Sequence, residues 1–483
     1  MSAASGIDFD LPWFWFYSCK HCFRMLTLSE MRREFRPMLR LALPLALTEL
    51  SWVAMGLVDT MMVGRLPYSA VAIGAVSLGT IFFYTLGIFG SSIMLGLDTL
   101  VSQAYGAGKL EDCHRAFFNA LYVALWLAPA LMLMIFIALP FLNGAGVDPQ
   151  VLAYTVPFVK VLTWSTLPLV LYFVLRRYLQ SMAIVKPVVF AGISANVVNL
   201  VGNWALVYGH FGFRGMGVSG SAWSTLVSRI YMVTILALAA IYYDRKRASG
   251  LWKASRRLDG QLTRQLLRLG LPAATQLVLE VSAFSITTVL IARLGALPLA
   301  GHQIALNVAS ITFMVPLGIG AAAAVRVGHA IGAQDFSAAA RAGWMALLFG
   351  ASFMSCSALV LFLFPHAIAR VYSPQMEVIR TGASLLIVAA VFQLFDGLQV
   401  VATGALRGAG DTRTPMFANL LSYWIVGVPL GAVLCFKFGF GAVGFWTGLC
   451  VALILIGSSL LIVWRRMTLR LTANTAAVIS AAS

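Results

Sequence analysis

Charged residues are scarce in this sequence of 483 residues. Asp, Glu, Lys and Arg together make up 11% of it, whereas 60% is hydrophobic. Soluble domains carry about 25% charged residues, and no polar stretch here exceeds about twenty-five residues, too few for a soluble domain. The composition therefore excludes an enzyme with a soluble catalytic domain.

The sequence instead contains long runs of apolar residues. They recur between Met38 and Trp464, and a helix of about twenty residues crosses the roughly 30 Å hydrocarbon core of a bilayer. A transmembrane β-barrel is excluded, because its strands would alternate apolar and polar residues over about ten positions. The sequence predicts twelve hydrophobic spans, which begin near residues 38, 71, 116, 152, 185, 217, 266, 299, 339, 380, 412 and 442.

Cysteine is also scarce, with six in the chain. Cys19 and Cys22 form one CxxC pair, but no second pair follows at metal-ligand spacing, so a zinc site is not predicted. The aromatic run before them is too short for a signal-peptide core and has no basic leader. We interpret residues 1–37 as an N-terminal cytoplasmic or interfacial segment, or as an over-extended start before Met25 or Met31, and assign it no function.

Acidic residues number only 17, which leaves a net charge of +17. That charge suggests nucleic-acid binding, but its distribution excludes this partner. If both termini share one side of the membrane, 26 Lys and Arg residues lie on that side and seven on the other, which identifies the first side as cytoplasmic. We expect a multi-pass protein of the cell inner (plasma) membrane with both termini in the cytoplasm. Its basic loop over 245–268 is expected to attract lipid headgroups.

The second half of the chain repeats the first. The sequence LRLALP at 39–44 returns as LRLGLP at 267–272, an offset of 228, and Lys-Pro at 186–187 returns as Thr-Pro at 414–415 at the same offset. Each half therefore holds six spans, and the two halves share one orientation about an axis along the membrane normal. This predicts an all-α polytopic membrane protein with two six-helix lobes facing a central cavity, as in an alternating-access transporter.

The repeat also sets the expected domain boundaries. The N-lobe takes 38–243 and the C-lobe 266–464. A basic cytoplasmic linker over 244–265 joins the lobes, and a cytoplasmic tail over 465–483 follows the last span.

Four carboxylates stand inside the predicted spans: Glu49 and Asp59 in the first, Glu280 in the seventh and Asp396 in the tenth. A charged side chain at membrane depth costs about 2.5–3.5 kcal/mol and normally faces a cavity or an ion path. The alternative is a structural hydrogen bond between helices, which has most weight for Asp59 because it lies near the outer end of its span. Glu49 lies about 80° from Asp59 around the helix and is the weaker candidate.

Polar side chains extend these acids into stripes, since residues three, four or seven apart share a helix face. The offset of 228 aligns the Asp59 stripe with the Glu280 stripe, so each lobe places a carboxylate on the same face. Asn ladders also serve as contacts between helices, which leaves the role of the Asn residues open. The stripes comprise Thr48, Trp52 and Asp59; Asn196, Asn199 and Asn203; Gln276, Glu280 and Thr287; and Gln393, Asp396, Gln399 and Thr403.

Buried carboxylates of this kind suit a cation-driven antiporter. A carboxylate in a low dielectric binds a proton or another cation instead of remaining a bare charge, so a coupling ion and an organic cation can compete for it. Aromatic side chains near the acids add cation–π attraction for lipophilic cations. Four such residues lie in the same spans as the acids: Trp52, Phe284, Phe392 and Phe395.

The same segments resemble the multidrug and toxic compound extrusion (MATE) family, in particular its NorM-like bacterial branch. The likeness runs over about residues 38–464. It is carried by VDTMMVG at 58–64, KP at 186–187, NLVGNW at 199–204, LGLP at 269–272 leading to Glu280, AGHQIALN at 300–307, RVGH at 326–329, FDGLQ at 395–399 and LRG at 406–408.

The resemblance implies two six-helix lobes in a V and export of cationic drugs and dyes in exchange for Na+ or H+. It assigns Asp59 as the acid of the first lobe, with Asn199 and Asn203 as polar partners. Glu280 and Asp396 match the cation site of the second lobe. Gln276, Phe392 and Gln399 complete our set of expected partners of substrate or ion.

The coupling ion stays open at this stage. Glu280 and Asp396 suit Na+, but the position one turn before Asp396, commonly tyrosine in the family, is Phe392 and lacks the hydroxyl ligand. Two neighbouring acids also favour a shared proton. We expect Na+ or H+ as the coupling ion, with Glu280 and Asp396 as ligands if it is Na+, no other cofactor, small cationic drugs and membrane lipids as partners, and a monomer.

The sequence gives less support to three other functions. The major facilitator class needs a Gly-x-x-x-Asp-Arg-x-Gly motif after the second span, where QAYGAGK stands at 103–109. A lipid-linked oligosaccharide flippase of the same superfamily needs several arginines in its cavity, and we place only Arg229 within a span. A membrane-bound acyltransferase needs a His-x4-Asp pair, whereas His114 and His329 are followed at that distance by Asn119 and Gln334. We therefore expect no enzymatic activity.

Overall fold

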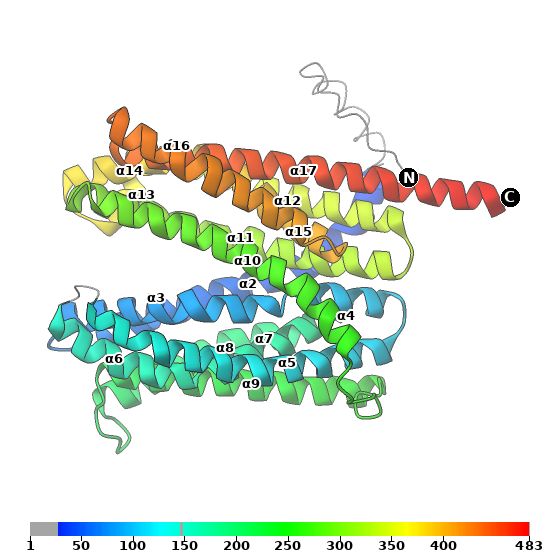
Figure 1. Cartoon of the computed structure of the whole chain (residues 1–483), viewed down its shortest axis with the longest axis horizontal. Coiled ribbons are helices and arrows are strands. Elements are labelled where there is room, and N and C mark those ends of the chain that lie inside the picture. The colour runs from blue at the N-terminus through cyan, green and yellow to red at the C-terminus, as the bar shows by residue number, and fades with distance from the viewer. Residues whose placement is uncertain (1–27, 145–147, 483) are drawn as a thin grey trace.

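The computed structural model describes the backbone of residues 28–144 and 148–482 and the side chains of 33–142 and 148–471. Residues 1–27, with the CxxC pair, lie outside the described residues. Within them the chain is helical throughout, and it forms two bundles (Figure 1). Eleven helices are long and apolar enough to cross a membrane, and a bent pair makes a twelfth span. The predicted twelve-span, two-lobe fold is confirmed.

The N-lobe contains the first six spans. Its first helix, α2, begins ten residues before the predicted start of the lobe because the Glu- and Arg-rich stretch ahead of the apolar run continues the same helix. The elements are α2 (Leu28–Val63), α3 (Ser69–Ile93), α4 (Gly96–Gly106), α5 (Leu110–Ala138), η1 (Leu139–Gly144), α6 (Pro149–Trp164), α7 (Thr166–Ser181), α8 (Lys186–Tyr208) and α9 (Val218–Arg247). The fourth span consists of α6 and α7, which bend by 44° at Ser165.

The C-lobe contains the other six. Its fifth span is irregular, with two π-helical stretches on either side of a short α-helix. The elements are α10 (Gly260–Ala292), α11 (Ala296–Gly332), α12 (Phe336–Leu363), α13 (Pro365–Tyr372), α14 (Met376–Gly408), α15 (Arg413–Asn419), η2 (Leu420–Gly427), α16 (Val428–Ala432), η3 (Val433–Lys437) and α17 (Gly441–Ala482).

Aspartate side chains start three of these helices. Each accepts a hydrogen bond from a free backbone N–H of the first turn, as helix N-caps do: Asp148 at α6, Asp259 at α10 and Asp335 at α12. Asp259 lies in the linker. The Leu262 and Gln261 N–H groups, followed by Arg115, hold the pKa of its carboxyl below the usual range.

The linker packs on the N-lobe before the chain enters the C-lobe. Arg115 of α5 forms an ion pair with Asp259 at 2.8 Å, and the Tyr122 hydroxyl donates to the Arg256 carbonyl at 2.7 Å. His114 bonds to the Ser249 carbonyl at 2.9 Å. These contacts fix the linker along α5, so α10 begins from a defined position.

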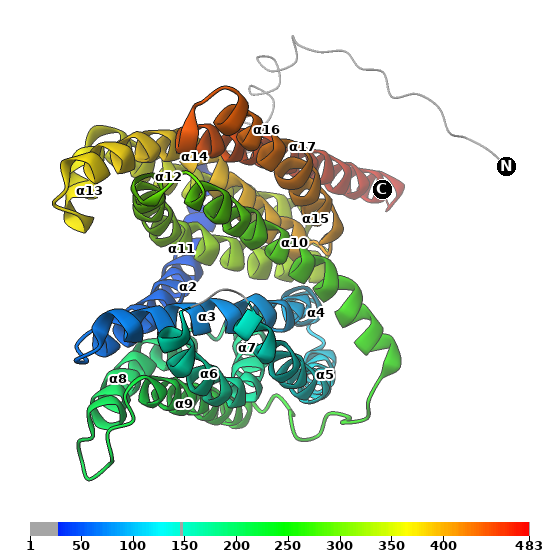
Figure 2. The same cartoon turned by 60° about the vertical axis from the view of Figure 1, so that its left-hand side comes forward.

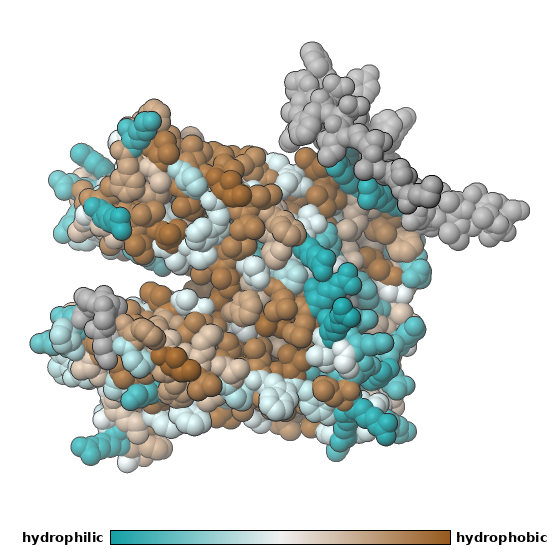
Figure 3. Space-filling model, in the orientation of Figure 1, coloured by the Kyte–Doolittle hydropathy of each residue, from teal (hydrophilic) through white to brown (hydrophobic). Residues whose placement is uncertain are grey.

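The two ends of the molecule differ in how closely the lobes approach. We call the end with the linker the linker end; its loops are 107–109, 182–185, 248–259, 333–335 and 409–412. There α2 and α4 pack on α11, and α3 and α4 on α10. At the opposite, open end the lobes splay apart, and a wedge-shaped hollow separates them (Figures 2 and 3).

Glycines allow the close contact near the linker end. A Cβ on Gly270 of α10 would collide with the Ile93 carbonyl oxygen, and one on Gly332 of α11 with the Gln103 carbonyl oxygen. Because each of these glycines faces backbone of the other lobe, the helices meet without intervening side chains.

A buried ion-pair node joins the lobes at the same level. Asp98 of α4 is 0% exposed and pairs with Arg177 of the N-lobe at 3.2 Å and Arg407 of the C-lobe at 3.4 Å. The Thr99 hydroxyl donates to the Arg407 carbonyl at 2.5 Å, and Gln103 Nε2 to the Gly408 carbonyl at 2.9 Å. Asp98 was not among the membrane-embedded acids expected from the sequence.

Candidate functional site

The N-lobe carboxylate, Asp59, is surrounded by side chains of two other helices. Asn199 and Asn203 of α8 donate Nδ2–H bonds to its Oδ1 at 3.0 and 2.7 Å. The Thr225 hydroxyl of α9 donates to Oδ2 at 2.9 Å, and the Ser221 hydroxyl, one turn before Thr225, lies nearby without a well-formed hydrogen bond in the described structure. All these donors are neutral, so the carboxylate is solvated without being neutralised.

Local sequence explains this cage. Asn199 and Asn203 are one turn apart and share a face of α8. The Asn199 carbonyl accepts from Asn203 Nδ2 at 2.9 Å and from the Ser224 hydroxyl at 2.8 Å. Gly202 lets α9 approach, because a Cβ there would meet the Ser224 hydroxyl. The expected grouping of Asp59 with the two Asn residues is therefore present, and Thr225 and Ser221 are members that sequence reasoning missed.

The C-lobe brings together Glu280 of α10 and Asp396 of α14, each 6% exposed. Gln399 Nε2 donates to Glu280 Oε1 at 2.8 Å, and the two carboxylates are near enough to interact electrostatically. Among the described residues, neither acid has a Lys, Arg or His partner. Two acids without a counter-charge need a proton or a cation from outside the protein.

Tyr423 is a site residue that the sequence did not reveal. It lies in η2, is 0% exposed and interacts electrostatically with both Glu280 and Asp396. Its hydroxyl faces Gln399 without a well-formed hydrogen bond in the described structure. The apolar run around it gave no signal, because its relation to the acids depends on how the eleventh span packs against α10.

Two oxygens beside the acids lack a hydrogen-bond partner. Gln399 Oε1 and Tyr423 Oη are both buried without such a partner within the described residues, and so is Thr403 Oγ1, one turn after Gln399 on α14. Carboxylate, amide and hydroxyl oxygens are the ligands that hard cations take. The described side chains hold no cluster of three or more His, Cys, Asp or Glu residues, so any cation here would rely on the two carboxylates and neutral oxygens.

Phe392 and Gln393 of α14 contact residues other than the two acids. Phe392 stacks on Trp446, with ring centres 5.8 Å apart, inside the C-lobe core. Gln393 Nε2 donates to the Thr312 and Ser357 hydroxyls at 2.9 and 2.8 Å. Gln276 is buried on α10, one turn before Glu280. The Phe392 ring thus belongs to the packing behind Asp396.

Glu49 has a structural partner. Its carboxylate forms an ion pair with Arg176 of α7, which is 2% exposed. The sequence counted Arg176 and Arg177 among the cytoplasmic charges and placed only Arg229 inside a span. The second expectation is wrong, because Arg176 and Arg177 are buried in α7, which is part of the fourth span. Glu49 and Asp98 supply counter-charges that single-sequence hydropathy does not reveal.

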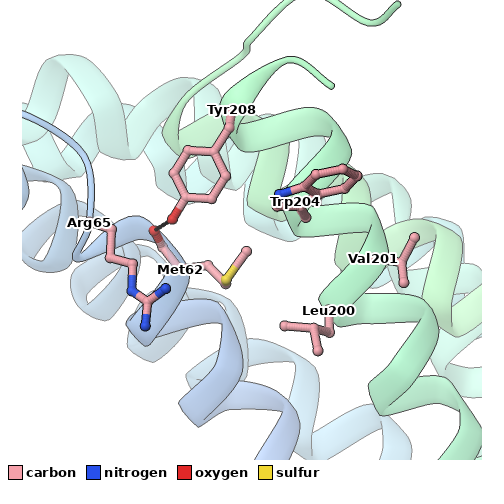
Figure 4. A pocket seen from close by; sticks show the side chains of 6 residues that line it. All are labelled: Met62, Arg65, Leu200, Val201, Trp204 and Tyr208. Atoms are coloured by element: carbon pink, nitrogen blue, oxygen red, sulfur yellow. Dashed lines mark hydrogen bonds between the residues drawn. The ribbon is translucent and has the colours of Figure 1, made fainter. Parts of the chain in front are cut away.

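A cavity of about 640 Å³ lies at the open end, between the last turns of α2 and α8 (Figure 4). The Tyr208 hydroxyl there donates to the Met62 carbonyl at 2.5 Å and ties the two helix ends together. None of the buried acids lines this cavity, which is bordered by Met62, Arg65, Leu200, Val201, Trp204 and Tyr208.

Comparison with known proteins agrees with the repeat and the fold. The MatE family model matches the chain twice, over residues 44–205 and 272–433, which are 228 residues apart. Two solved structures share the fold: a eukaryotic MATE transporter, AtDTX14 (TM-score 0.81, 22% identity, 92% of this chain and 99% of that one), and an outward-facing multidrug resistance MATE family transporter of the MOP superfamily (0.80, 16%, 91% and 97%).

Sequence relatives cover nearly the whole chain. The probable multidrug resistance protein NorM of Brucella suis is 35% identical over 94% of this chain and 98% of its own length. The probable NorM of Mesorhizobium japonicum is 36% identical over 90% and 94%. With two family matches in tandem, these carboxylates in each lobe and this degree of identity, the chain belongs to the MATE family and to its NorM-like branch.

Proposed function

We propose that this protein is a secondary active multidrug efflux transporter. It exports cationic, lipophilic drugs and dyes in exchange for Na+ or H+ by alternating access. The observation that carries the proposal is the set of carboxylates without basic partners among the described residues: half-buried Asp59 in one lobe, and buried Glu280 with Asp396 in the other. The names of the NorM relatives agree with it.

The C-lobe pair is the proposed coupling site. Glu280 and Asp396 attract a cation because each buried charge lacks a counter-ion in the described protein. A proton neutralises one carboxylate, whereas Na+ also takes neutral oxygens such as those of Gln399 and Tyr423 as ligands. Occupancy of this pair then alters the electrostatic interaction between the Glu280 side chain of α10 and the Asp396 side chain of α14.

Asp59 is the proposed carboxylate for the organic cation. Its neutral donors Asn199, Asn203 and Thr225 hold the carboxylate in place, and a cation that approaches closely replaces some of those bonds with a stronger charge–charge contact. The aromatic ring of Trp52, two turns deeper on the same face of α2, offers a surface for a planar cation.

In transport by alternating access, the open end must close and the closed end must open. The structure is closed near the linker end by the Asp98 node and the glycine contacts. By the distribution of basic residues, we assign the linker end to the cytoplasm and the membrane to the inner membrane. The structure then corresponds to an outward-facing state, from which a drug is released outside and the coupling ion enters.

The decisive experiment is ethidium efflux from proteoliposomes under separately imposed sodium and proton gradients. Wild-type protein should respond to at least one gradient. Asp396→Asn and Glu280→Gln should each abolish coupled efflux while folded protein stays in the membrane, and Glu111→Gln, an exposed residue at the start of α5, should not. Wild-type rates in both site variants would reject the coupling assignment.

A lipid-linked oligosaccharide flippase is the second candidate. Such a protein would need several free arginines for a diphosphate, but Arg176, Arg177 and Arg407 are engaged by Glu49 and Asp98, which leaves Arg229 as the one buried arginine of these four without an acidic partner among the described residues. Flipping of a fluorescent lipid-linked oligosaccharide without dye efflux would favour this candidate. We propose no enzymatic activity.

A further inference from the structure

The N-lobe holds a buried arginine that the proposed cycle does not use. Arg229, in α9, is 2% exposed. Its guanidinium donates to the Ser165 hydroxyl and, at 3.0 Å, to the Tyr84 hydroxyl, and its Cζ lies 5.0 Å from the Phe83 ring centre. All of these partners are neutral. Within the described residues no Asp or Glu forms an ion pair with it, and its Nε has no hydrogen-bond partner.

Arg229 lacks an acidic partner within the described residues, whereas other buried arginines have one. Arg176 is paired with Glu49, and Arg177 and Arg407 share Asp98. Burying a guanidinium without a counter-charge costs several kcal/mol, and an ionisable side chain kept at membrane depth normally serves a ligand or an ion path. The missing counter-charge points to an anion supplied from outside the chain.

The position of Arg229 relative to Asp59 indicates which anion. Thr225, which donates to Asp59 Oδ2 at 2.9 Å, is one turn before Arg229 on the same face of α9. Thr225 and Arg229 are about 6 Å apart along the α9 axis, so the Asp59 carboxylate and the Arg229 side chain lie along one face of that helix. A ligand that carries a positive and a negative group can contact both.

We propose that Arg229 is a specificity-determining residue of the N-lobe, which binds the carboxylate of a zwitterionic amphiphile while Asp59 binds its cationic group. This inference rests on the proposed function and narrows its substrate class. Tyr84 is the half-buried member of the arginine's shell, and its neutral hydroxyl gives way to the ligand carboxylate. A charged acceptor bonds a guanidinium about twice as strongly as a neutral one.

Aromatic residues lie beside Arg229 and its hydrogen-bond partner Tyr84. Trp52 is edge-on to Tyr84, with ring centres 6.5 Å apart, and is stacked on Tyr172 at 6.0 Å. Because Trp52 and Tyr84 are only half-buried, they offer flat apolar surfaces next to Arg229, so the preferred ligand is a planar aromatic zwitterion.

A purely structural role for Arg229 would give a different pattern of variant effects. Arg229 also donates a hydrogen bond to the Ser165 hydroxyl, which lies at the 44° bend between α6 and α7. If this hydrogen bond were the only role of Arg229, loss of the guanidinium would weaken the binding of every ligand alike. Ser165→Ala removes this hydrogen bond and keeps the charge of Arg229, so this variant separates the two roles.

The test uses two dyes that share one xanthene cation and differ in one group. Rhodamine 110 carries a free carboxylate, and rhodamine 123 is its methyl ester. Binding is measured by fluorescence polarisation with purified full-length protein. Arg229→Gln should weaken binding of rhodamine 110 at least about tenfold and that of rhodamine 123 less than about twofold, and Arg229→Lys should lie between.

Matched controls complete the design. Arg115→Gln removes a surface arginine and should alter neither dye, and Ser165→Ala should keep the preference for rhodamine 110. Equal loss of both dyes in Arg229→Gln, or no loss of rhodamine 110, would overturn the inference. Efflux of rhodamine 123 by wild-type proteoliposomes tests the proposed function separately, because that dye has no carboxylate for Arg229.

Discussion

At the scale of single residues, buried charges fall into two classes. Glu49 and Asp98 are satisfied by arginines, whereas Asp59, Glu280 and Asp396 meet only neutral side chains or one another. The first class fixes the structure, because removing one partner would strand a buried charge. The second class retains capacity for a ligand, which is why we assign transport to it.

Tyr423 should contribute to sodium binding if Na+ is the coupling ion. Tyr423→Phe removes one neutral oxygen beside Glu280 and should raise the half-saturating sodium concentration about two- to tenfold, as expected for a lost polar contact of about 0.5–1.5 kcal/mol. Sodium-dependent dye efflux at clamped pH measures it. Tyr372→Phe, exposed in α13, is the control. An unchanged sodium dependence in a sodium-coupled protein would remove Tyr423 from the site.

The sequence alone predicts that Phe392→Tyr lowers the half-saturating sodium concentration by restoring a hydroxyl. The stacking of Phe392 on Trp446 changes this expectation, because a hydroxyl added there enters the core. We now expect Phe392→Tyr to lower thermal stability without improving sodium affinity, as measured by melting temperature and sodium-dependent efflux. A clear gain in affinity would restore the original interpretation.

Asp59→Asn should impair drug export more than cation binding. Its carboxylate lies in the N-lobe cage of Asn199, Asn203 and Thr225, separate from the Glu280 site. Isothermal titration with the coupling ion should keep its signal in Asp59→Asn and lose it in Asp396→Asn. The reverse result would show that the division of labour between the lobes is wrong.

At the scale of helices, the lobes meet by close backbone contact near the linker end. Gly270 and Gly332 lie against carbonyl oxygens of the other lobe, and we propose that this contact keeps that end closed. The irregular fifth span of the C-lobe has its own role, because η2 places Tyr423 beside the acids.

A larger side chain in the seam should hold the lobes apart near the linker end. Gly332→Val places two methyl groups where α11 meets the Gln103 carbonyl, and should increase the distance between spin labels at Glu111→Cys and Ala333→Cys. Gly56→Val is the matched control, since a Cβ at Gly56 meets no atom within 4 Å. Unchanged distances in Gly332→Val would mean that the seam tolerates side chains and does not gate closure.

At the scale of the whole molecule, charge and shape give the two ends different properties. Hydrophilic residues concentrate at the linker end (Figure 3), where the lobes meet, and the wedge-shaped hollow opens at the other end. This combination agrees with our proposal that the linker end faces the cytoplasm.

Reporter fusions should show the proposed orientation. Green fluorescent protein fused after Gly250 in the linker should fluoresce, and alkaline phosphatase fused after Gly212 in the loop between α8 and α9 should be active. The exchanged fusions should both be inactive, because each reporter works on only one side of the membrane. Active phosphatase at Gly250 would reverse the topology and the assignment of an outward-facing state.

The sequence by itself determined the features that depend on composition and periodicity. Apolar run lengths predicted the twelve spans, the offset of 228 predicted two lobes, and helical phase grouped Asp59 with Trp52 and Asn199 with Asn203. These are local properties, set by the rise of a helix and the thickness of a bilayer. The family resemblance came from the same local motifs.

Only the tertiary structure decided which side chains share a site. Tyr423, Thr225 and the arginine partners of Glu49 and Asp98 come from helices distant in sequence. Hydropathy cannot tell a buried arginine that has a counter-charge from one at the membrane surface. Arg176 has an acidic partner, and Arg229 has none in the described structure. This difference depends on how the helices rotate and cross, which is determined by packing across the whole bundle.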